Sequence, residues 1–449
     1  MIDLFPHQRK VLETTKGKNR VAYYLDMGLG KTFVGSEKML ELGAMVNLLV
    51  CQKSKVQDWV DHFEKFYGYP GNLETGCNPY HVIDLTKWKP GDFKNEDKFV
   101  TDLIAGQIIY VINYELAWRR KDLLNLKHFT LMLDESSLIQ NEKSKRAKFI
   151  MDLNPENVIL LSGTPTDGKY ERLWSQLHLL GWGISKDLYM KQYVDTQWIE
   201  DDSGFKIPII AGYKNVDRLK DKLAFYGAVF MKSEEAFTLP QQIDIPTYVS
   251  ASRKYREFVR KSVVAVKKLD ENGSEIGEEM ELIGDTRLTK RMYCRMLCGQ
   301  FSKEKLQAFT DLIWSTNERL IVFYNFNEEL ELLTKVASTK TEHISIVNGQ
   351  VKDLQNYSDF DDSITFIQYQ AGAMGLNLQK ANRIVYYSLP QKYEHFEQSK
   401  KRIHRIGQER TCFYHYLLCR NSVELDILET LKMRKDYTDA LFEKYMVKG

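Results

Sequence analysis

The sequence predicts an α/β protein with two lobes, each built around its own parallel β-sheet. At 449 residues the chain exceeds the length at which one hydrophobic core keeps growing, so two or more domains are expected. Short apolar segments alternate with helical stretches in two separate regions, which is typical of parallel sheets. A more irregular, more charged stretch lies between these regions. We therefore expect one lobe on either side of it.

The first region begins with a polar helix near residues 8–15 and a short strand at 21–25, which a glycine-rich turn follows. Apolar runs predict further strands of this lobe at 48–50, 108–112, 131–133 and 158–161. In the second region the same pattern predicts strands at 320–323, 364–367 and 383–387.

The stretch between the regions carries its own signals. A tight turn at residues 201–204 separates two short predicted strands, 197–199 and 205–210. Residues 239–250 are expected to be extended and to form the crossover between the lobes. The charge pattern of residues 253–300 predicts helix, interrupted by a mobile loop at 272–274. The last apolar and charged residues, 422–447, have helical spacing and are expected to pack back on the body.

Charge and cysteine content narrow the class of protein. The 63 Lys and Arg against 61 Asp and Glu give a net charge of +2, so any nucleic-acid surface must be a local patch. The start of the chain is not typical of a secretory signal, and no apolar run approaches the ~18 residues of a membrane span. The six scattered cysteines favour reduced thiols. Cys294 and Cys298 share a helix face, and a buried thiol pair is favoured there over a metal site.

A phosphate-binding loop is predicted at Met27-Gly28-Leu29-Gly30-Lys31-Thr32, which follows a strand and precedes a helix. Glycines let the backbone N–H groups and the helix N-terminus approach phosphates. Lys31 would contact the β- and γ-phosphates, and the Thr32 hydroxyl would ligate Mg²⁺. The general pattern asks for glycine five residues before Gly30, where this chain has Leu25. A helix-capping turn is the plainer alternative.

A pair of acids a hundred residues later is the natural partner of this loop. Asp134 and Glu135 end the apolar strand 131–133, where the carboxyl edge of a sheet would expose them. Asp134 would hold Mg²⁺, and Glu135 would orient and deprotonate the attacking water. An ordinary acidic strand end is the alternative, and the pairing with Lys31 makes it the weaker one.

With these motifs on the chain, the sequence resembles superfamily-2 helicases and, more closely, the Swi/Snf-type DNA translocases. Segments similar to the family's motifs run through nearly the whole chain: residues 6–8 (glutamine motif), 49–54 (motif Ia), 112–115 (Ib), 161–165 (III), 321–326 (IV) and 371–378 (V). The resemblance implies two tandem RecA-like lobes with helical insertions and a C-terminal helical brace. It implies an N-terminal ATP-binding lobe at 1–240 and a C-terminal helicase lobe at 241–449.

The most specific match is the run from Gln398 to Gln408, with Arg402-Ile403-His404-Arg405-Ile406-Gly407-Gln408. Two arginines three apart are expected on one helix face, where they can point together. In the family, Arg402 and Arg405 would act as arginine fingers on the γ-phosphate. The alternative is an exposed basic helix.

The resemblance also implies binding roles for less distinctive residues. ATP contacts are expected from Gln8, Gly375, Asn377 and Gln398 in addition to the phosphate loop. Nucleic-acid contacts are expected from Lys53, Ser54, Asn113, Tyr114, Asn325, Phe326, Gln370 and Gly372. Polar loops without a binding role are the plainer alternative near Asn113 and Asn325.

The chain departs from the family pattern at three places. Motif II reads Asp134-Glu135-Ser136-Ser137, where the family usually has His at the fourth position. This alters the usual polar link to motif III. Motif V begins at residues 368–370 without the typical Ser or Thr, and residues 231–233 lack the family's paired arginines. The central insertions resemble most the compact branch that includes annealing helicases.

The leading prediction is a cytoplasmic, monomeric Mg-ATP-dependent motor that translocates on double-stranded DNA, in a bacterial cell or phage-infected host. A separate protein partner is expected to guide it. The alternatives are a strand-separating DNA or RNA helicase, an ATP-gated clamp that does not travel, and an unrelated phosphate-loop kinase or GTPase. The second-lobe arginines disfavour the last of these.

Overall fold

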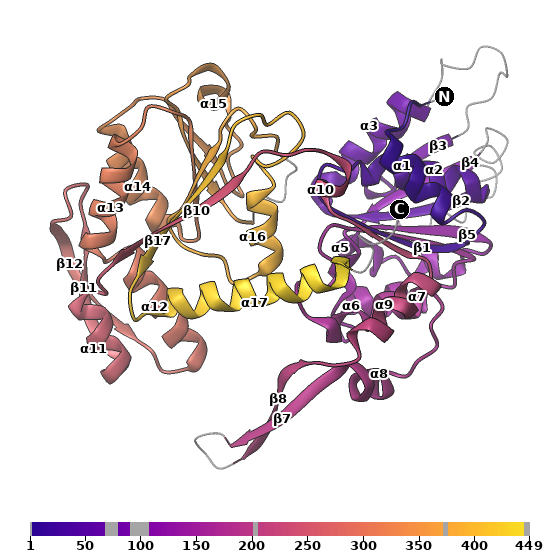
Figure 1. Cartoon of the computed structure of the whole chain (residues 1–449), viewed down its shortest axis with the longest axis horizontal. Coiled ribbons are helices and arrows are strands. Elements are labelled where there is room, and N and C mark those ends of the chain that lie inside the picture. Colours follow the sequence, from indigo (N-terminus) through magenta and orange to yellow (C-terminus); the bar gives the residue numbers. More distant parts are fainter. Residues whose placement is uncertain (1, 68–79, 90–106, 201–204, 371–375, 444–449) are drawn as a thin grey trace. The chain divides into compact units, whose positions relative to one another are not determined.

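A computed structural model describes residues 2–67, 80–89, 107–200, 205–370 and 376–443 (Figure 1). The chain divides into two compact units: unit 1, Met1–Ala236 with Asp436–Gly449, and unit 2, Phe237–Lys435. The sequence places the boundary at residue 240 and assigns all that follows to the second lobe. The end of the C-terminal helix groups with unit 1 instead.

Seven of the described strands of unit 1 form one parallel sheet in the order β3-β4-β2-β5-β6-β1-β9. The strands are β1 (Arg20–Leu25), β2 (Val46–Cys51), β3 (Tyr80–Asp84), β4 (Gln107–Asn113), β5 (Phe129–Asp134), β6 (Asn157–Ser162) and β9 (Ala228–Met231). The predicted strands of the first region are confirmed, and β3 and β9 are additional to them. Because every neighbouring pair is parallel, the carboxyl ends of all seven strands lie at one edge.

Helices cover the sheet of unit 1 and bury its near-continuous apolar strands, as expected for a parallel sheet. They are α1 (Pro6–Thr14), α2 (Lys31–Leu42), α3 (Val56–Tyr67), α5 (Tyr114–Ala117), α6 (Lys145–Asp152), α7 (Trp174–Leu179), α8 (Lys186–Tyr193), α9 (Val216–Phe225) and α10 (Ser233–Ala236). The core contains β2, β4, β5 and β6 side chains that are fully buried, Leu48, Ile112 and Leu131 among them. This core fixes the positions at which the strands end.

A separate two-stranded hairpin projects from unit 1 (Figure 1). Its strands, β7 (Val194–Glu200) and β8 (Lys206–Tyr213), are antiparallel and confirm the two short strands predicted there, while the predicted turn at 201–204 lies outside the described residues. Apolar side chains of the hairpin are exposed, with Trp198 on β7 66% and Phe205, immediately before β8, 73% accessible. A lone hairpin is marginal in water, so these exposed side chains mark a surface suited to contact with another molecule.

Six of the described strands of unit 2 form a parallel sheet in the order β10-β17-β16-β13-β15-β14. They are β10 (Gln242–Val249), β13 (Leu320–Tyr324), β14 (Ile344–Val347), β15 (Ile364–Gln368), β16 (Arg383–Tyr386) and β17 (Cys412–Cys419). The three strands predicted in this region are confirmed. The segment expected to be extended near residue 245 is the edge strand β10.

The helices of unit 2 are α11 (Arg253–Lys261), α12 (Arg287–Gly299), α13 (Lys303–Trp314), α14 (Asn327–Ser338), α15 (Gln355–Asp359) and α16 (Tyr393–Lys400). The prediction of helix throughout 253–300 is wrong, because an antiparallel hairpin of β11 (Val263–Leu269) and β12 (Glu275–Ile283) lies between α11 and α12. The β-branched valines of β11 favour a strand. The expected mobile loop is the turn of this hairpin, where Asp270 Oδ1 accepts hydrogen bonds from the backbone N–H groups of Asn272 and Ser274.

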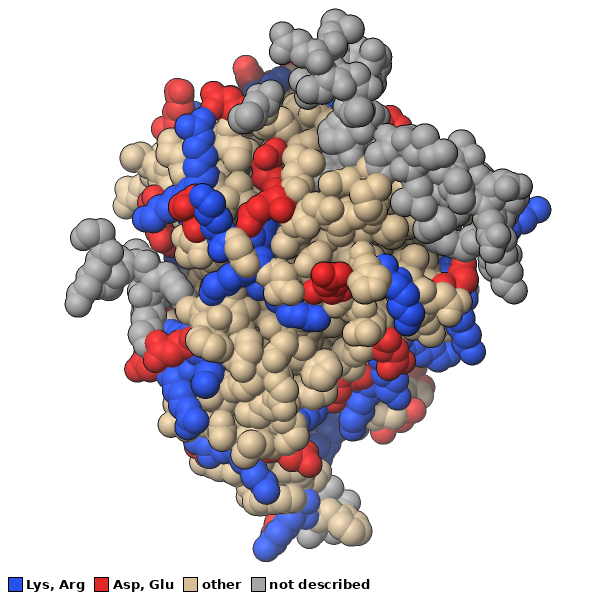
Figure 2. Space-filling view, turned by 90° about the vertical axis from the view of Figure 1, so that its right-hand side faces the viewer, with Lys and Arg blue, Asp and Glu red and all other residues tan. Residues whose placement is uncertain are grey.

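The C-terminal helix α17 (Val423–Glu443) confirms the helical prediction for residues 423–443, and residues 444–447 of that prediction lie outside the described residues. Its last turns pack on unit 1: Tyr437 O accepts a hydrogen bond from the Tyr170 hydroxyl at 2.6 Å, and Asp439 pairs with Lys232 at 3.0 Å. Among the described residues, no helix has the length and apolar character that crossing a bilayer requires. Acidic and basic side chains are interspersed on the face in Figure 2, in keeping with the small net charge.

Candidate functional site

Three neighbouring strands of unit 1 end in the residues that the motifs single out. The phosphate loop follows β1, Asp134 ends β5, and Ser162 ends β6, which lies between β5 and β1 in the sheet. The carboxyl edge of a parallel sheet therefore brings the loop, the acids and motif III together, which is where α/β proteins commonly bind ligands.

The phosphate loop is shaped by glycines with left-handed backbone angles. Gly28 has φ +89° and Gly30 has φ +75°, and Gly30 is the residue before the first turn of α2. A Cβ atom at Gly30 would lie 2.1 Å from Gln8 Nε2, so a side chain cannot fit without moving Gln8. Lys31 Nζ donates to the carbonyl oxygens of Leu25 at 2.8 Å and Asp26 at 3.2 Å. Its ammonium is thus held inside the loop, where a phosphate would meet it.

Gln8 lies against the phosphate loop but uses both ends of its amide within the protein. Its Nε2 donates to Leu29 O at 3.2 Å, and its Oε1 accepts from the Phe5 backbone N–H at 2.9 Å. The side chain is 3% exposed. To contact adenine, Gln8 would have to exchange these bonds, so its role in ATP binding stays a prediction.

Asp134 is fixed by its neighbours at the end of β5. Trp59 Nε1, on α3, donates to Asp134 Oδ2 at 2.8 Å, and the Tyr114 hydroxyl donates to Asp134 O at 3.0 Å. Burial raises the pKa of Asp134, while the Trp59 hydrogen bond and the charges of Lys31 and Lys55 act in the opposite direction. One oxygen of the carboxylate is therefore held by Trp59, and the charge of Lys31 acts on the group. Trp59 is a site residue whose role the sequence did not reveal.

The other acid of motif II has a strained backbone. Glu135 has φ +52°, a left-handed conformation that costs a residue with a side chain roughly 1–2 kcal/mol. Its Oε2 accepts a hydrogen bond from the Ser162 hydroxyl at 3.4 Å. Motif III thus contacts the acid directly. Strain of this kind is characteristic of functional sites.

A second link between motifs II and III runs through Gln176 on α7, which is fully buried. Its Oε1 accepts from the Ser136 hydroxyl at 2.7 Å and from the Tyr24 hydroxyl at 3.0 Å. Its Nε2 donates to Pro165 O, in motif III, at 2.7 Å. Motif II therefore keeps a polar connection to motif III through Ser136 and Gln176, whereas, among the described residues, the Ser137 hydroxyl, at the position where the family usually has His, takes no part in it.

We expect Trp59→Phe to lower ATP turnover by about tenfold to a hundredfold and to raise the Mg²⁺ concentration for half-maximal activity. The substitution removes one hydrogen bond to a carboxylate, which contributes roughly 1.5–3 kcal/mol. Steady-state hydrolysis at varied Mg²⁺ measures both effects. Trp174→Phe is the matched control, because the Trp174 indole donates to a carbonyl, Ile184 O, away from Asp134. Equal losses in both variants would contradict the role of Trp59.

We expect Ser136→Ala to lower the free energy of unfolding by about 1 kcal/mol, since one buried hydrogen bond to Gln176 is removed. Nucleic-acid stimulation of hydrolysis should fall more than basal hydrolysis, because the link between motifs II and III is weakened. Denaturant titration and ATPase assays with and without duplex DNA measure these effects. Ser137→Ala is the control, since the buried Ser137 hydroxyl has no hydrogen-bond partner among the described residues. Unchanged stability and stimulation in Ser136→Ala would contradict the link.

The arginines of unit 2 do not share a helix face, and that prediction is wrong. Helix α16 ends at Lys400, and Arg402 and Arg405 lie in the turns that follow it. Arg402 is 1% exposed, and its Nη1 donates to Leu376 O at 3.4 Å. Arg405 is half-buried, and its Nη1 donates to Asn377 Oδ1. Arg405 is therefore the more accessible of the two guanidinium groups.

Buried polar contacts explain why the helix ends before the arginines. Gln408 Nε2 donates to the carbonyl oxygens of Ala381 at 2.8 Å and Gln379 at 3.1 Å. His404 Nε2 lies 2.9 Å from Pro240 O, and Ile403 is fully buried. These anchors turn the chain back onto the sheet.

Two more predicted ATP contacts of unit 2 are described. Asn377 accepts the hydrogen bond of Arg405, while Gln398 is buried on α16 and donates to Glu394 Oε1 at 3.2 Å. Gly375 lies outside the described residues. Roles for Asn377 and Gln398 in ATP binding stay predictions.

A groove of about 630 Å³ lies at the carboxyl edge of unit 1, beside the ends of β2, β3 and β4. Lys53 and Asn113 line it together with Asp84, Glu115 and Arg119. Lys53 and Ser54 are exposed, whereas Asn113 is buried and donates to Glu115 Oε2 at 3.1 Å. Lys53 and Asn113, expected to bind nucleic acid from different motifs, thus meet in one groove.

The nucleic-acid contact predicted for the Tyr114 side chain is wrong. Tyr114 is 1% exposed, and its hydroxyl points beneath motif II to Asp134 O. An aromatic side chain that follows a buried strand packs into the core here, and only its hydroxyl finds a polar partner.

In unit 2 the predicted contact residues Asn325 and Phe326 follow β13. Asn325 Nδ2 donates to Ser388 Oγ at 2.8 Å and Leu389 O at 3.1 Å. Glu329, fully buried, accepts from the backbone N–H groups of Asn325 at 2.9 Å and Phe326 at 3.2 Å. The amide of Asn325 therefore orders the loop. Gln370 is exposed, two residues after the end of β15, and Gly372 lies outside the described residues.

Most of the chain matches two known protein domains. Residues 24–302, more than half of the chain, match the SNF2-related domain, and residues 304–407 match the helicase conserved C-terminal domain. The chain belongs to the SNF2-related family. It is thus a helicase-type ATPase by sequence, and the resemblance seen in the motifs is confirmed.

Relatives of this SNF2-related chain are distant. It is 23% identical over 92% of its length to the SWI/SNF-related matrix-associated actin-dependent regulator of chromatin subfamily A member 1 of Mus musculus, covering 40% of that protein. It is 24% identical over 93% of its length to the ISWI chromatin-remodeling complex ATPase ISW1 of Saccharomyces cerevisiae, covering 39% of it. It is 24% identical over 70% of its length to the putative ATP-dependent helicase/translocase YwqA of Bacillus subtilis, covering 36% of it. The chain therefore spans about two fifths of the length of these relatives.

Among solved structures, the SNF2-related chain is similar to the Sulfolobus solfataricus SWI2/SNF2 ATPase core in complex with dsDNA. The TM-score is 0.43 at 18% identity, over 98% of this chain and 92% of that one.

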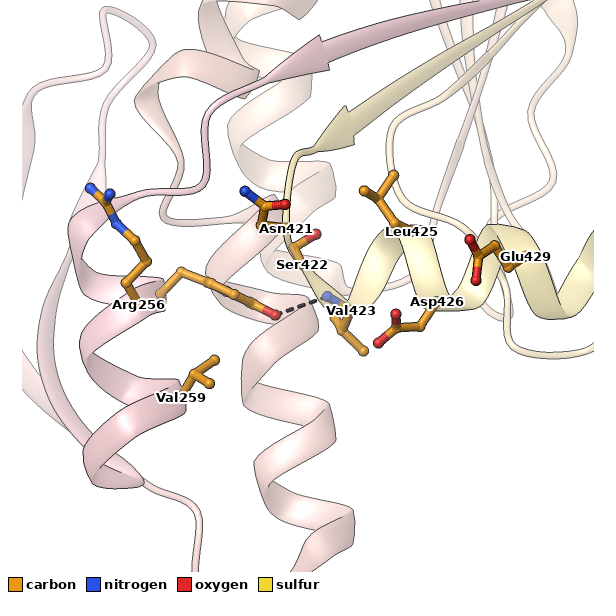
Figure 3. Close-up of a pocket in the computed structure, with 9 residues that line it drawn as sticks. Arg256, Val259, Asn421, Ser422, Val423, Leu425, Asp426 and Glu429 are labelled. Atoms are coloured by element: carbon orange, nitrogen blue, oxygen red, sulfur yellow. Dashed lines mark hydrogen bonds between the residues drawn. The ribbon is translucent and has the colours of Figure 1, made fainter.

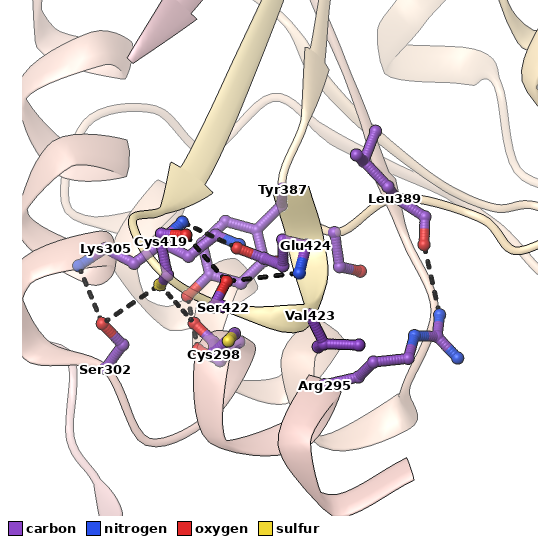
Figure 4. A network of polar contacts seen from close by, with 12 residues as sticks. Arg295, Cys298, Ser302, Lys305, Tyr387, Leu389, Cys419, Ser422, Val423 and Glu424 are labelled. Atoms are coloured by element: carbon purple, nitrogen blue, oxygen red, sulfur yellow. Dashed lines mark hydrogen bonds and ion pairs between the residues drawn. The ribbon is translucent and has the colours of Figure 1, made fainter. Parts of the chain in front are cut away.

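Two features of the SNF2-related chain lie outside its motifs. A hollow of about 500 Å³ between α11 and the start of α17 is lined by Arg256, Asp426 and Glu429 among others, and contains none of the motif residues (Figure 3). A buried cluster joins Cys298, Cys419 and Glu424 (Figure 4).

The cysteine cluster already contains a cation. The buried Lys305 ammonium is ion-paired with Glu424, so the place that a metal ion would take carries a positive charge. Cys294 is buried and free, as is Cys298, which agrees with the predicted thiol pair.

Proposed function

We propose that this chain is an ATP-dependent motor that translocates on double-stranded DNA and hydrolyses ATP between its two units. The observation that carries the proposal is the placement of Lys31, Asp134 and Glu135 at one edge of the sheet, after strands β1 and β5 that flank β6, with Asp134 held by Trp59. Family membership supports helicase-type chemistry. The relative from Bacillus subtilis, described as a putative helicase/translocase, supports movement on nucleic acid.

Four motif residues of unit 1 have distinct roles in this proposal. Lys31 binds the β- and γ-phosphates, for which it must leave the Leu25 and Asp26 carbonyl oxygens. Thr32 and Asp134 offer the hydroxyl and carboxylate oxygens that Mg²⁺ prefers, and Mg²⁺ would neutralise phosphate charge there. Glu135 orients the attacking water and accepts its proton.

Unit 2 supplies arginine side chains that add to the positive charge of Lys31. Arg405, with Arg402 behind it, stabilises negative charge that develops on the γ-phosphate. Because the phosphate loop and the arginines belong to different units, bound ATP favours the closed arrangement of the two. The groove beside Lys53 and Asn113 and the loop at Asn325 and Phe326 bind the DNA backbone. Backbone contacts carry little sequence information, which suits movement over any sequence.

ATPase assays with duplex DNA, single-stranded DNA and RNA test this proposal. We expect duplex DNA to stimulate hydrolysis most strongly. Stimulation by single strands alone, together with unwinding of a duplex, would overturn it in favour of a strand-separating helicase.

The hairpin of β7 and β8 favours strand separation as the second candidate function. Exposed Trp198 and Phe205 lie near its tip, and aromatic rings of this kind stack on unpaired bases. In that case Trp198→Ala with Phe205→Ala would abolish duplex unwinding and leave stimulated hydrolysis intact. Phe225→Ala is the control, because Phe225 is 72% exposed on α9, outside the hairpin. Unwinding that persists in the double variant would remove the reason for this candidate.

A further inference from the structure

A row of three arginines runs along one face of α12. Arg287, Arg291 and Arg295 are spaced four residues apart, so they lie above one another on the helix. Arg287 and Arg291 are exposed, and Arg295 is half-buried. None of the three belongs to a motif that predicts a nucleic-acid contact. With a rise of 1.5 Å per residue, the row spans about 12 Å.

The inner end of the row reaches the motif IV loop. Arg295 Nη2 donates to Leu389 O at 3.2 Å, a contact that Figure 4 shows, and its guanidinium lies 5.2 Å from the centre of the Phe326 ring. Leu389 O also accepts from Asn325 Nδ2. Arg295 and Asn325 therefore share an acceptor, and the arginine row continues directly from the loop that is expected to bind DNA.

The middle of the row carries positive charge that is available to a ligand. Among the described residues, Arg291 has no carboxylate within ion-pair distance. Burial is the main cause of the lowered pKa of Arg295. The charge of Arg291 also lowers this pKa, while Glu329 raises it. One carboxylate oxygen of Glu329, Oε2, accepts hydrogen bonds from the backbone N–H groups of the motif IV loop. Like charges four residues apart on a helix repel each other, so a polyanion on this face would relieve the repulsion.

We propose that the α12 row binds the phosphates of one strand of duplex DNA, as an extension of the motif IV contact. The proposal rests on the proposed function and assigns a DNA surface outside the family motifs. One strand of a duplex carries a phosphate about every 3.4 Å of axis, so 12 Å matches roughly three to four phosphates. Leu288, 80% exposed, and Met292, 38% exposed, lie beside the row and offer apolar contact to sugars.

The test uses the full chain with the two exposed arginines neutralised, Arg287→Gln with Arg291→Gln. We expect the duplex Kd to rise about tenfold, and the slope of log Kd against log salt to fall by about 1 for each phosphate that the variant no longer binds. ATP turnover at saturating duplex should equal that of the wild type, because neither residue touches the nucleotide-binding loop. Arg291→Lys, which keeps the charge, should bind duplex almost as tightly as the wild type.

Lys335→Gln is the matched control, since Lys335 is an exposed cation near the other end of α14 from Phe326. Its affinity and salt slope should equal those of the wild type. Wild-type affinity and slope in the double arginine variant would overturn the α12 proposal and leave the motor intact. Failure of the wild-type chain to bind or respond to duplex would overturn the proposed function, and the α12 proposal with it.

Discussion

Lys31→Ala is expected to reduce ATP turnover by at least about a hundredfold to a thousandfold and to leave unit 1 folded. The ammonium is the only side-chain cation in the phosphate loop, and losing a charge that stabilises a phosphoryl transition state costs roughly 3–4 kcal/mol. In the structure Lys31 Nζ donates to two part-buried carbonyl oxygens of the adjoining loop, so its removal affects the fold locally. Single-turnover hydrolysis and thermal unfolding measure the two effects separately.

Lys16→Ala is the matched control for this variant. Lys16 forms an exposed ion pair with Glu13, and such surface pairs contribute little. Its turnover and melting temperature should stay at wild-type values. Near-normal hydrolysis by Lys31→Ala would mean that the phosphate site is assigned to the wrong residues.

Arg405→Ala is expected to reduce turnover by about a thousandfold while ATP binding to unit 1 persists. An arginine finger acts on charge that develops in the transition state, so its removal lowers kcat far more than it weakens binding. Arg405 is better suited to this test than Arg402, because Arg402 is almost fully buried and its removal would also destabilise unit 2. Fluorescent-nucleotide binding and steady-state hydrolysis distinguish kcat from affinity.

Arg410→Ala is the control for the finger. Arg410 lies five residues further along, is exposed, and pairs with Glu318 at 3.3 Å. Its turnover should be that of the wild type. Hydrolysis by Arg405→Ala at the rate of the Arg410→Ala control would contradict the role of Arg405 on the γ-phosphate.

The strands that position the site were predictable because a parallel sheet buries both faces of its strands. Continuous apolar runs such as Leu131-Met132-Leu133 therefore stand out, and the motif residues at their ends follow at once. The edge strands β3 and β9 were missed, since β3 is polar in part and β9 has only four residues. Local pattern is weakest where burial is one-sided or the strand is short.

Other errors come from tertiary contacts that no local pattern contains. The turns after Lys400 replace a helix because Gln408 and His404 bind distant carbonyl oxygens, those of Ala381 and Pro240. Tyr114 packs under Asp134 instead of facing the groove. The link through Gln176 joins motifs II and III from α7, forty residues after Ser136, and only folding brings it into contact.

Triplex displacement tests the central claim most directly, because it requires movement along a duplex and not only ATP hydrolysis. The full chain, with Mg-ATP and a duplex that carries a third strand at one end, should release that strand at a rate that depends on ATP. The Lys31→Ala chain should release none above background. Duplex-stimulated hydrolysis without any displacement by the wild-type chain would contradict translocation and indicate an ATP-gated clamp.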